Sequence, residues 1–384
     1  MLRNLLRTVL FLIVLAVALV VVMKVRYGGD TVPFPDRSTE PMLPSSALQV
    51  VASLSEAPGN IAVSKSGRVF ITFHPEGHPA GMKVAELVRG KPVPFPNAEF
   101  QQSRGSGEPY FDKVFSLRID NQNRLWTLDT GFHGLSKPRL LAFDLDSGQL
   151  VHQWDMPHDV GGIGSYVQDF QVSGDGRFVF LADVSAIGLS PALIAYDVRQ
   201  KDGRRVLEGE PSMNGGNFTI AAYGHVLSFF MGLYKMHPGV DSIALDHRDV
   251  WMYFGPMSHE TLFRVPADDL RMASRPNIAA HVEKFGPKPQ SDGLTMDSEN
   301  SVYITDVEHG AISVLNQERE LKTVIRDEKR IRWADGLSLT QDGWLYITDS
   351  AIPDLMLQSR EHVLAAGPYF VYRVQVGKKG RAGH

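Results

Sequence analysis

Residues 292–308, DGLTMDSENSVYITDVE, decide the fold, and residues 335–351 repeat their plan as DGLSLTQDGWLYITDSA. In each stretch apolar and polar residues alternate, and a polar turn with Gly, Asn or Asp separates two such runs. Alternation with a period of two on both sides of a short turn predicts a β-hairpin. Four earlier stretches follow the same plan: residues 59–73, 115–131, 168–184 and 241–257.

Second hairpins follow most of these copies. They cover residues 140–154, 193–207, 261–270 and 311–325, and residues 369–376 form one further strand. Two hairpins make the four strands of one propeller blade. Six copies therefore predict an all-β, six-bladed β-propeller over residues 47–376, with a β-sandwich or two smaller β domains as the alternative. The strand at 47–54 would complete the last blade and cover edges that would otherwise be exposed.

The composition excludes several classes of function. Among 384 residues there are 39 basic and 43 acidic side chains and no cysteine. A mildly acidic chain lacks the basic surface that nucleic-acid binding requires, so we expect no nucleic-acid partner. Without cysteine there are no disulfides, zinc–thiolate sites, iron–sulfur clusters or cysteine nucleophiles.

The first 27 residues predict a single N-terminal transmembrane or signal helix. Arg3 and Arg7 precede an apolar run at 8–23, which is long enough to approach the ~30 Å hydrocarbon core of a bilayer. No small-residue cleavage site follows, which favours an uncleaved signal-anchor in residues 1–27 over a cleaved signal peptide. The propeller would then be exported and held by this helix at the extracytoplasmic side of a membrane, or secreted if the signal is cleaved.

Two further segments flank the predicted propeller, and one interrupts it. Residues 28–46 are rich in Pro, Ser and Gly and predict a tether, and residues 377–384 form a basic C-terminal tail. Residues 208–240 exceed what a blade needs and carry several aromatic residues and methionines. Such an excursion forms either a lid or pocket wall, or a filling between blades.

A phrase in the second copy resembles a known family. RLWTLDTG at 124–131, followed by LLAFDLDSGQLVHQWDMP at 140–157, is similar to the Yellow/major royal jelly protein family, with further likeness at 179–200, 239–270 and 291–306. The resemblance implies a six-bladed propeller with a central site for a small-molecule ligand. It implies dopachrome conversion, amine binding or storage as family activities. The chain differs from secreted insect members in lacking cysteine and in keeping an anchor.

More distantly, the chain resembles the gluconolactonase/regucalcin-like propellers, which hold calcium on the axis. Asp292 matches the Asp of their DG phrase, and Asp241 falls where they usually carry Asn. Their first-blade glutamate is absent, because Gly59 and Asn60 occupy that stretch. The resemblance implies calcium as the one candidate cofactor, held by Asp292, Asp241 and Asp335.

The starts of the inner strands supply the candidate ligand site. Equivalent positions in the six blades form a ring around the axis, where carboxylates repel one another unless a cation or protons intervene. Some of these residues could instead cap turns. The candidates for binding or catalysis on this ring are Asn60, Gln168, Asp169, Asp241, Asp292 and Asp335.

Aromatic and histidine residues add to this set. Tyr166 and Trp333 precede ring carboxylates and could stack on an aromatic ligand or fill the space between blades. His133 and His309 leave second strands on the same rim; each on its own is typical of a surface histidine, and one of them could transfer protons. The acidic residues that end second strands recur too regularly for catalysis and predict turn-binding roles: Asp129, Asp183, Asp306 and Asp349.

Three functions follow from these observations. The first is an exported, Yellow-like propeller that binds, and as an isomerase tautomerises, a small dopachrome-like aromatic molecule in an axial pocket, with Asp292, Asp335, His133 and His309 as the catalytic candidates. The second is a calcium-dependent lactonase or esterase. The third is a non-catalytic propeller that binds a ligand or a protein, since this fold hosts many functions.

Overall fold

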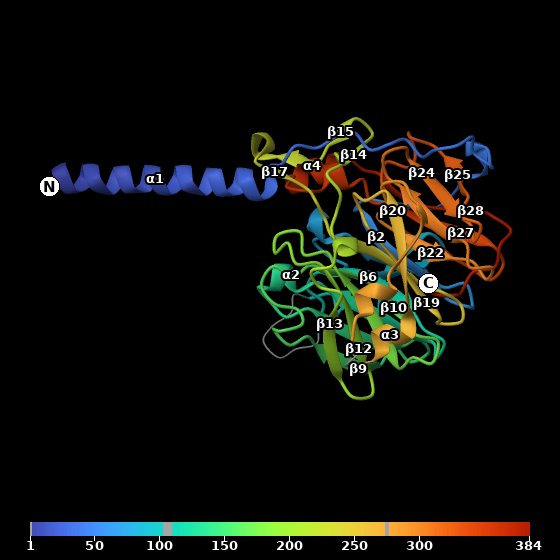
Figure 1. The fold of residues 1–384 in the computed structure, drawn as a ribbon. Helices are drawn as coiled ribbons and strands as arrows, with labels where there is room; N and C mark the ends of the chain where they lie inside the picture. Colours follow the sequence, from blue (N-terminus) through green and yellow to red (C-terminus); the bar gives the residue numbers. More distant parts are fainter. Residues whose placement is uncertain (1, 103–109, 273–275) are drawn as a thin grey trace.

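The computed structural model describes residues 2–102, 110–272 and 276–384, and within them the chain forms a six-bladed propeller (Figure 1). Each blade is an antiparallel sheet of four strands, and in the first five blades the order from the axis outward follows the chain. The first three blades are β2 (Pro58–Val63), β3 (Val69–Phe73), β4 (Val84–Val88) and β5 (Lys91–Pro94); β6 (Val114–Ile119), β7 (Arg124–Asp129), β8 (Arg139–Asp144) and β9 (Leu150–Asp155); and β10 (Val167–Val172), β11 (Phe178–Asp183), β12 (Ala192–Asp197) and β13 (Asp202–Val206).

The sixth blade closes the ring with a strand from each end of the propeller. Residues 49–54 pair with residues 369–373 in an antiparallel register, from Gln49 opposite Arg373 to Leu54 opposite Tyr369. The predicted role of the first strand is therefore confirmed. The last three blades are β18 (Val240–Leu245), β19 (Trp251–Pro256), β20 (Thr261–Pro266) and β21 (Glu283–Pro287); β22 (Leu294–Met296), β23 (Val302–Asp306), β24 (Ala311–Leu315) and β25 (Leu321–Arg326); and β26 (Ala334–Leu339), β27 (Trp344–Asp349), β28 (Tyr369–Gln375) and β1 (Gln49–Leu54).

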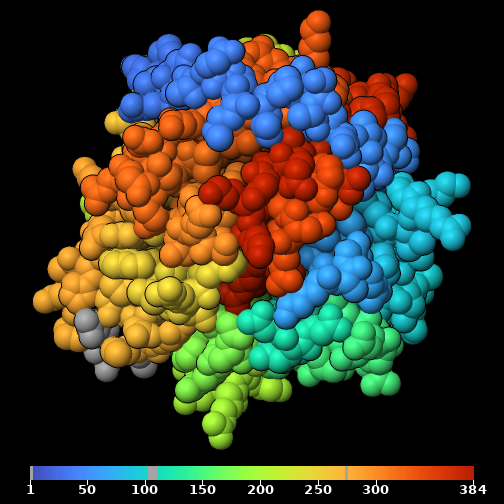
Figure 2. Space-filling model, turned by 90° about the vertical axis from the view of Figure 1, so that its right-hand side faces the viewer, coloured from blue at the N-terminus to red at the C-terminus, as the bar shows by residue number. Residues whose placement is uncertain are grey.

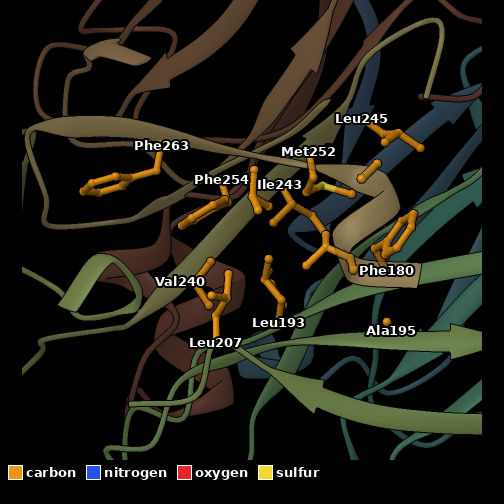
Figure 3. Packing of buried hydrophobic residues seen from close by; sticks show 14 of the residues in the cluster. Phe180, Leu193, Ala195, Leu207, Val240, Ile243, Leu245, Met252, Phe254 and Phe263 are labelled. Carbon is orange, nitrogen blue, oxygen red and sulfur yellow. The ribbon is translucent and has the colours of Figure 1, made fainter. Parts of the chain in front are cut away.

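The core lies between neighbouring blades, because both faces of each sheet are covered. All six residues of β10 and of β18 are buried. Between blades three and four, Phe180 and Leu193 face Ile243 and Phe254 (Figure 3). Each such side chain contributes about 1.5–3 kcal/mol when it is removed from water, so packing between blades fixes where the inner strands begin.

The acidic residues that end second strands bind backbone N–H groups, as predicted. Asp183 accepts from the N–H groups of Ser185 at 3.0 Å and of Tyr166 at 2.7 Å. Asp349 accepts from Trp333 N–H at 2.8 Å. These carboxylates therefore hold the residues that enter the first strand of the same blade as well as the following turn.

Helices are short apart from the first. The α-helices are α1 (Leu2–Tyr27), α2 (Gly131–Gly134), α3 (Ala267–Arg271) and α4 (Arg360–Ala365), and the 3-10 helices are Ser45–Ala47, Pro75–Gly77, Pro211–Met213, Phe230–Gly232, Ile278–His281 and Ile352–Asp354. Helix α1 runs away from the propeller on the side where α2 and β17 (Tyr234–Lys235) lie (Figure 1). It is long and apolar enough to cross a membrane.

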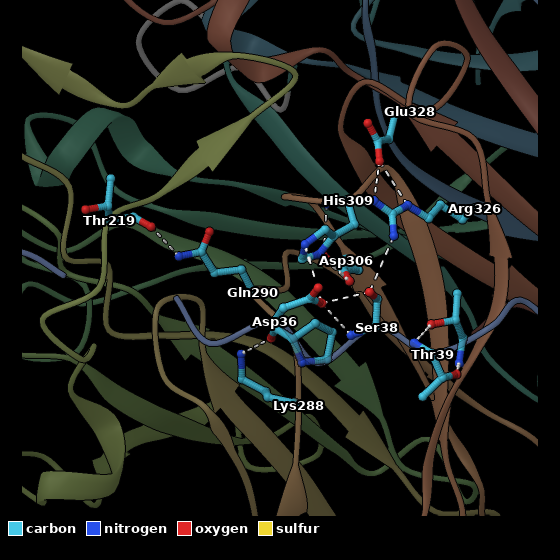
Figure 4. A network of polar contacts seen from close by, with 12 residues as sticks. Asp36, Ser38, Thr39, Thr219, Lys288, Gln290, Asp306, His309, Arg326 and Glu328 are labelled. Carbon is cyan, nitrogen blue, oxygen red and sulfur yellow. Dashed lines mark hydrogen bonds and ion pairs between the residues drawn. The ribbon is translucent and has the colours of Figure 1, made fainter. Parts of the chain in front are cut away.

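The segment predicted as a tether packs against the propeller. Met42 N–H and Leu43 N–H donate to the carbonyls of Thr323 and Val324, on the outer strand of blade five. Nearby, Asp36 lies 3.5 Å from His309, among the polar contacts drawn in Figure 4. The free edge of β25 offers unpaired backbone groups, which this segment satisfies.

The C-terminal tail closes one end of the axis. Figure 2 shows the face opposite α1, with the red C-terminal segment at its centre. Gly383 N–H donates to Val63 O, Ile119 N–H to Gly383 O, and Leu339 N–H to His384 O. These partners end the inner strands of three blades, so the tail joins them at the hub.

Candidate functional site

A cavity of about 360 Å³ lies on the propeller axis, at the end where α1 joins the molecule. Inner strands form its floor, and the insertion between β13 and β18 forms much of its upper wall. That insertion contains β14 (Ala221–Ala222), β15 (His225–Val226), β16 (Ser228–Phe229) and β17. Its predicted role as a pocket wall is confirmed by the residues that it adds to the lining, which are Phe229, Phe230, Tyr234, Met236 and Pro238.

One side of the cavity is an aromatic wall. Tyr166 stacks on His133 with 4.5 Å between ring centroids and meets Phe115 edge-on at 5.5 Å. The Tyr166 hydroxyl donates to Glu76 at 3.1 Å. Burial raises the pKa of Tyr166 well above its usual value and lowers the pKa of His133. Both side chains are therefore neutral at physiological pH, which suits contact with a flat ligand.

Trp333 and Asp292 meet on the floor of the cavity. The indole N–H of Trp333 donates to the Asp292 carboxylate at 2.5 Å, and Trp333 itself is only 1% exposed. Burial raises the pKa of Asp292 to about 7, while the hydrogen bond from Trp333 opposes that rise. Asp292 can therefore exchange a proton near neutral pH.

Beneath this floor lies a smaller chamber of about 20 Å³, enough for one water molecule or one ion. Its walls include the four carboxylates Asp169, Asp241, Asp292 and Asp335. Burial raises the pKa of Asp241 and of Asp335 well above usual values, and the charge of Asp292 raises both further. The ring therefore holds protons at neutral pH, as mutual repulsion of the carboxylates predicts.

A buried arginine stands among these carboxylates. Arg118 donates to Asp169 at 2.7 Å and also to the side-chain oxygen of Asn60. It is 2% exposed. Arg118 was not predicted as a site residue, because Phe115 and Ser116, which begin the inner strand of blade two, are uncharged. The available signal was an arginine within the apolar strand FSLRI.

A histidine missed as a site residue faces the same ring. His74 Nε2 lies 3.7 Å from Asp335 Oδ2, and neither atom has a hydrogen-bond partner within the described residues. Glu76 N–H donates to His74 Nδ1 at 3.2 Å, which leaves the ring proton on Nε2, facing Asp335. Burial lowers the pKa of His74 to about 4, so the imidazole is neutral.

The structure brings most of the predicted site residues together. The ring residues Asn60, Gln168, Asp169, Asp241, Asp292 and Asp335 all line the cavity or the chamber, and Tyr166, Trp333 and His133 line the cavity. Gln168 donates to Asp241. His309 lies elsewhere: it lines neither the cavity nor the chamber and binds Asp306, whose hydrogen bond raises the pKa of His309.

A metal site was also predicted on this ring. Among the described residues, no group of three or more His, Cys, Asp or Glu side chains is arranged to hold a metal ion. The geometry offers a physical reason, because the Arg118 guanidinium already supplies a positive charge between Asn60 and Asp169.

Known proteins resemble this chain in sequence. Residues 113–362 match the family model "Major royal jelly protein". Major royal jelly protein 9 of Apis mellifera is 23% identical over 214 residues, covering 51% of this chain and 47% of that protein. A Yellow-related salivary protein of Lutzomyia longipalpis is 24% identical over 335 residues, covering 79% of each chain. The chain thus spans about half the length of the first of these relatives.

Solved structures share the architecture at low identity. A calcium-binding protein, regucalcin, from Agrobacterium tumefaciens aligns with a TM-score of 0.54 and 12% identity, covering 90% of this chain and 98% of that one. A gluconolactonase from Xanthomonas campestris aligns with a TM-score of 0.53 and 12% identity, covering 90% and 97%. At such identity the likeness shows the propeller fold alone.

Proposed function

Because this chain belongs to the major royal jelly protein family, we propose that its axial cavity binds a small aromatic molecule and that the carboxylates of its floor move a proton on that molecule. The observation that carries the proposal is the juxtaposition of Asp292 and Trp333 at the bottom of an aromatic-walled cavity. The ring of Tyr166 would flank the ligand, and the carboxyl groups would face its polar end.

The floor supports an isomerisation that needs only proton transfer. Asp241 and Asp292 both line the cavity, and the pKa of Asp241 lies well above its usual value, whereas that of Asp292 is about 7. Two acids with different proton affinities can serve as donor and acceptor. Asp292 would take a proton from a carbon of the ligand, while Asp241 gives one to a ligand oxygen. One C–H bond breaks and one O–H bond forms, and no co-reactant is consumed.

After the reaction the two carboxyl groups must return to their starting protonation states. After one turnover Asp292 is protonated and Asp241 is ionised, and the proton must return between them. The chamber below has room for one water molecule that could carry it. Asp335 and the Nε2–H group of His74, which lie 3.7 Å apart, form a second proton-holding pair beside this path.

We also propose that the propeller is exported and that α1 remains as its anchor. Arg26 donates to Gly188 O at 3.1 Å and the Tyr27 hydroxyl donates to Ile187 O at 2.8 Å. The end of the helix is therefore bonded to the propeller. A signal peptide removed after export would have no need of such bonds.

The second candidate is a calcium-dependent lactonase, favoured by the likeness of fold to regucalcin and gluconolactonase. The residues present do not fit calcium well. An ion in the chamber would lie beside the guanidinium of Arg118, which already pairs with Asp169 at 2.7 Å. Like charges this close repel, which disfavours a metal-dependent reaction in the chamber. A third candidate, a binding protein without catalysis, needs the same cavity but no proton transfer.

One experiment separates the three. Purified full chain is mixed with dopachrome, with tyramine and with gluconolactone, each with calcium or with a chelator, and turnover and melting temperature are measured. We expect turnover of dopachrome, unchanged by the chelator and lost in Asp292→Asn. Binding of tyramine without any turnover would indicate a binding protein. Chelator-sensitive hydrolysis of gluconolactone would indicate the lactonase and overturn the proposal.

A further inference from the structure

Large apolar side chains stand exposed around the mouth of the cavity. We call Leu135, Ile163, Ile187, Phe230, Met231 and Leu357 the apolar rim. They come from the loop after β7, the loop after β9, the loop after β11, the insertion and the segment before α4. Five stretches of chain far apart in sequence thus present the same kind of side chain at one end of the axis.

Contacts place these residues at the mouth. Ile187, Phe230 and Leu357 line the cavity and are at the same time more than 40% exposed, at 44%, 62% and 62%. Leu135 and Ile163 lie in two loops joined by the hydrogen bond from Gly164 N–H to His133 O. Met231 follows Phe230 and is fully exposed.

The exposure is unusual for an aqueous surface. Leu135 is 72% and Ile163 76% exposed, and apolar area left in water costs about 25 cal/mol per Å². Soluble monomers rarely gather such residues in one patch, and a patch of this kind marks an interaction surface. Single exposed valines elsewhere, such as Val50 and Val250, need no such explanation.

Helix α1 indicates what covers the rim. Its 26 residues reach about 39 Å at 1.5 Å per residue, more than the ~30 Å hydrocarbon core. Its last residue, Tyr27, donates its hydroxyl proton to the backbone of Ile187 in the rim. Because the helix leaves the propeller on this side (Figure 1), a bilayer that it crosses must lie against the rim.

The end of helix α1 forms part of the cavity wall. Met23 and Tyr27 belong to its lining, and Lys24 and Arg26 beside them mark the depth of lipid headgroups. A molecule in the upper cavity would touch Met23, a residue within the apolar part of α1. The mouth is therefore level with the interface of the bilayer rather than with bulk water.

We propose that the apolar rim inserts into the bilayer surface and that the axial cavity opens to the membrane, so that the ligand is a membrane-partitioned amphiphile with an aromatic head. Insertion of the apolar rim does not depend on the proposed function, whereas the ligand class rests on it. The head would lie against Trp333 and Asp292, and the apolar part would extend past Phe230 towards the lipid.

The absence of native cysteine makes the surface testable. Full chain in lipid vesicles carries one spin label, at Met231→Cys or Ile163→Cys in the rim, or at Val250→Cys in the β18–β19 turn. Relaxation by oxygen, which concentrates in lipid, is compared with relaxation by a water-soluble nickel chelate. We expect both rim labels to favour oxygen and the Val250→Cys label to favour nickel. A rim label that is as accessible to nickel as the control overturns the proposal.

A second experiment tests the ligand class. Full chain in nanodiscs is titrated with phenol and with 4-octylphenol, and the change in Trp fluorescence is followed. Ala186→Phe, which adds a bulky side chain to the upper cavity without adding a tryptophan, serves as the control for unspecific effects of the bilayer. We expect 4-octylphenol to bind at least tenfold more tightly than phenol, and the gain to vanish in the control. Equal affinities would overturn the ligand class and leave the rim and the aromatic site standing.

Discussion

Arg118 and Asp169, on neighbouring blades, form a buried ion pair with 2.7 Å between guanidinium nitrogen and carboxylate oxygen. The same guanidinium also donates to Asn60 of blade one, and the second oxygen of Asp169 accepts from Ile243 N–H of blade four at 3.1 Å. Four blades are thus bonded at the hub through one pair. The pair therefore both joins the inner strands and supplies the positive charge of the acidic ring.

Replacing Arg118 by leucine should destabilise the protein. The substitution leaves Asp169 buried without its partner, which typically costs about 3–5 kcal/mol. We expect that loss in the free energy of unfolding measured with urea. Arg199→Leu, at an exposed arginine, is the matched control and should stay within about 0.5 kcal/mol of the wild type.

The same variant distinguishes arginine from calcium as the resident cation. Without Arg118 the chamber contains carboxylates alone, and added calcium should raise the melting temperature of Arg118→Leu. The wild type should melt at the same temperature with calcium and with a chelator. A wild type that calcium stabilises would show that the arginine and the metal occupy the hub together.

Replacing Asp292 by asparagine should change the pH dependence of stability. The pKa of Asp292 rises from 3.8 to about 7 on folding, so between about pH 4 and pH 7 the folded chain holds a proton that the unfolded chain has released. Its contribution to stability falls as the pH rises through that window. The melting temperature of Asp292→Asn relative to wild type should therefore increase from pH 4 to pH 7.

Other groups also titrate between pH 4 and pH 7, but their contribution to stability cancels when Asp292→Asn is compared with the wild type. His74, with its pKa lowered to about 4, acts with the opposite sign but is present in both proteins. Asparagine keeps an oxygen that can accept the indole N–H of Trp333. A difference in melting temperature that stays constant between pH 4 and pH 7 would show that Asp292 is ionised in the folded protein.

The fold was predictable because its signals are local. Period-two alternation and turn residues define each hairpin, and repetition defines the ring, so even the closure by residues 47–54 could be inferred. The packing of residues 28–46 against β25 was not predictable, since it depends on a free strand edge and irregular backbone contacts that leave no pattern in the sequence. The closing of the hub by residues 377–384 was not predictable for the same reason.

The site was predictable only in part. Equivalent positions in repeated hairpins converge on the axis, and this rule gave Asp169, Asp241, Asp292 and Asp335. It could not give Arg118, which sits further along its strand, or His74, whose ring orientation depends on the backbone of Glu76. His309 was proposed because loops that leave second strands lie on one rim, but this pattern does not specify which of these loops turn inward. The loop that carries His309 turns towards the tether.

Asp183 is predicted to position Tyr166. Its carboxylate, fully buried, accepts from Tyr166 N–H at 2.7 Å and pairs with Arg205 at 2.6 Å. Asp183→Ala removes the acceptor of the Tyr166 and Ser185 N–H groups, while Arg205 keeps its ion pair with Glu208 at 3.1 Å, and should cost about 2–4 kcal/mol. Asp268→Ala, at an exposed aspartate, should cost less than about 0.5 kcal/mol.

A second readout separates positioning from stability alone. At a temperature where Asp183→Ala is still folded, displacement of Tyr166 should weaken the binding of an aromatic ligand such as tyramine. Asp183→Asn, which keeps the oxygen that accepts from Tyr166, should lose stability but retain binding. Equal binding by the alanine and asparagine variants would contradict the positioning role.

The tail offers a matched pair of glycines that tests whether it closes the hub in solution. Gly377 and Gly383 both have positive φ, +70° and +85°, so alanine strains the backbone at either position by about 1 kcal/mol. A β-carbon at 377 would meet open space, whereas one at 383 would overlap the carbonyl of Ile119 in the inner strand β6. Gly383→Ala should therefore lower the melting temperature several degrees more than Gly377→Ala. Similar melting temperatures for the two variants would mean that the tail leaves the hub open. The cavity would then communicate with both ends of the propeller.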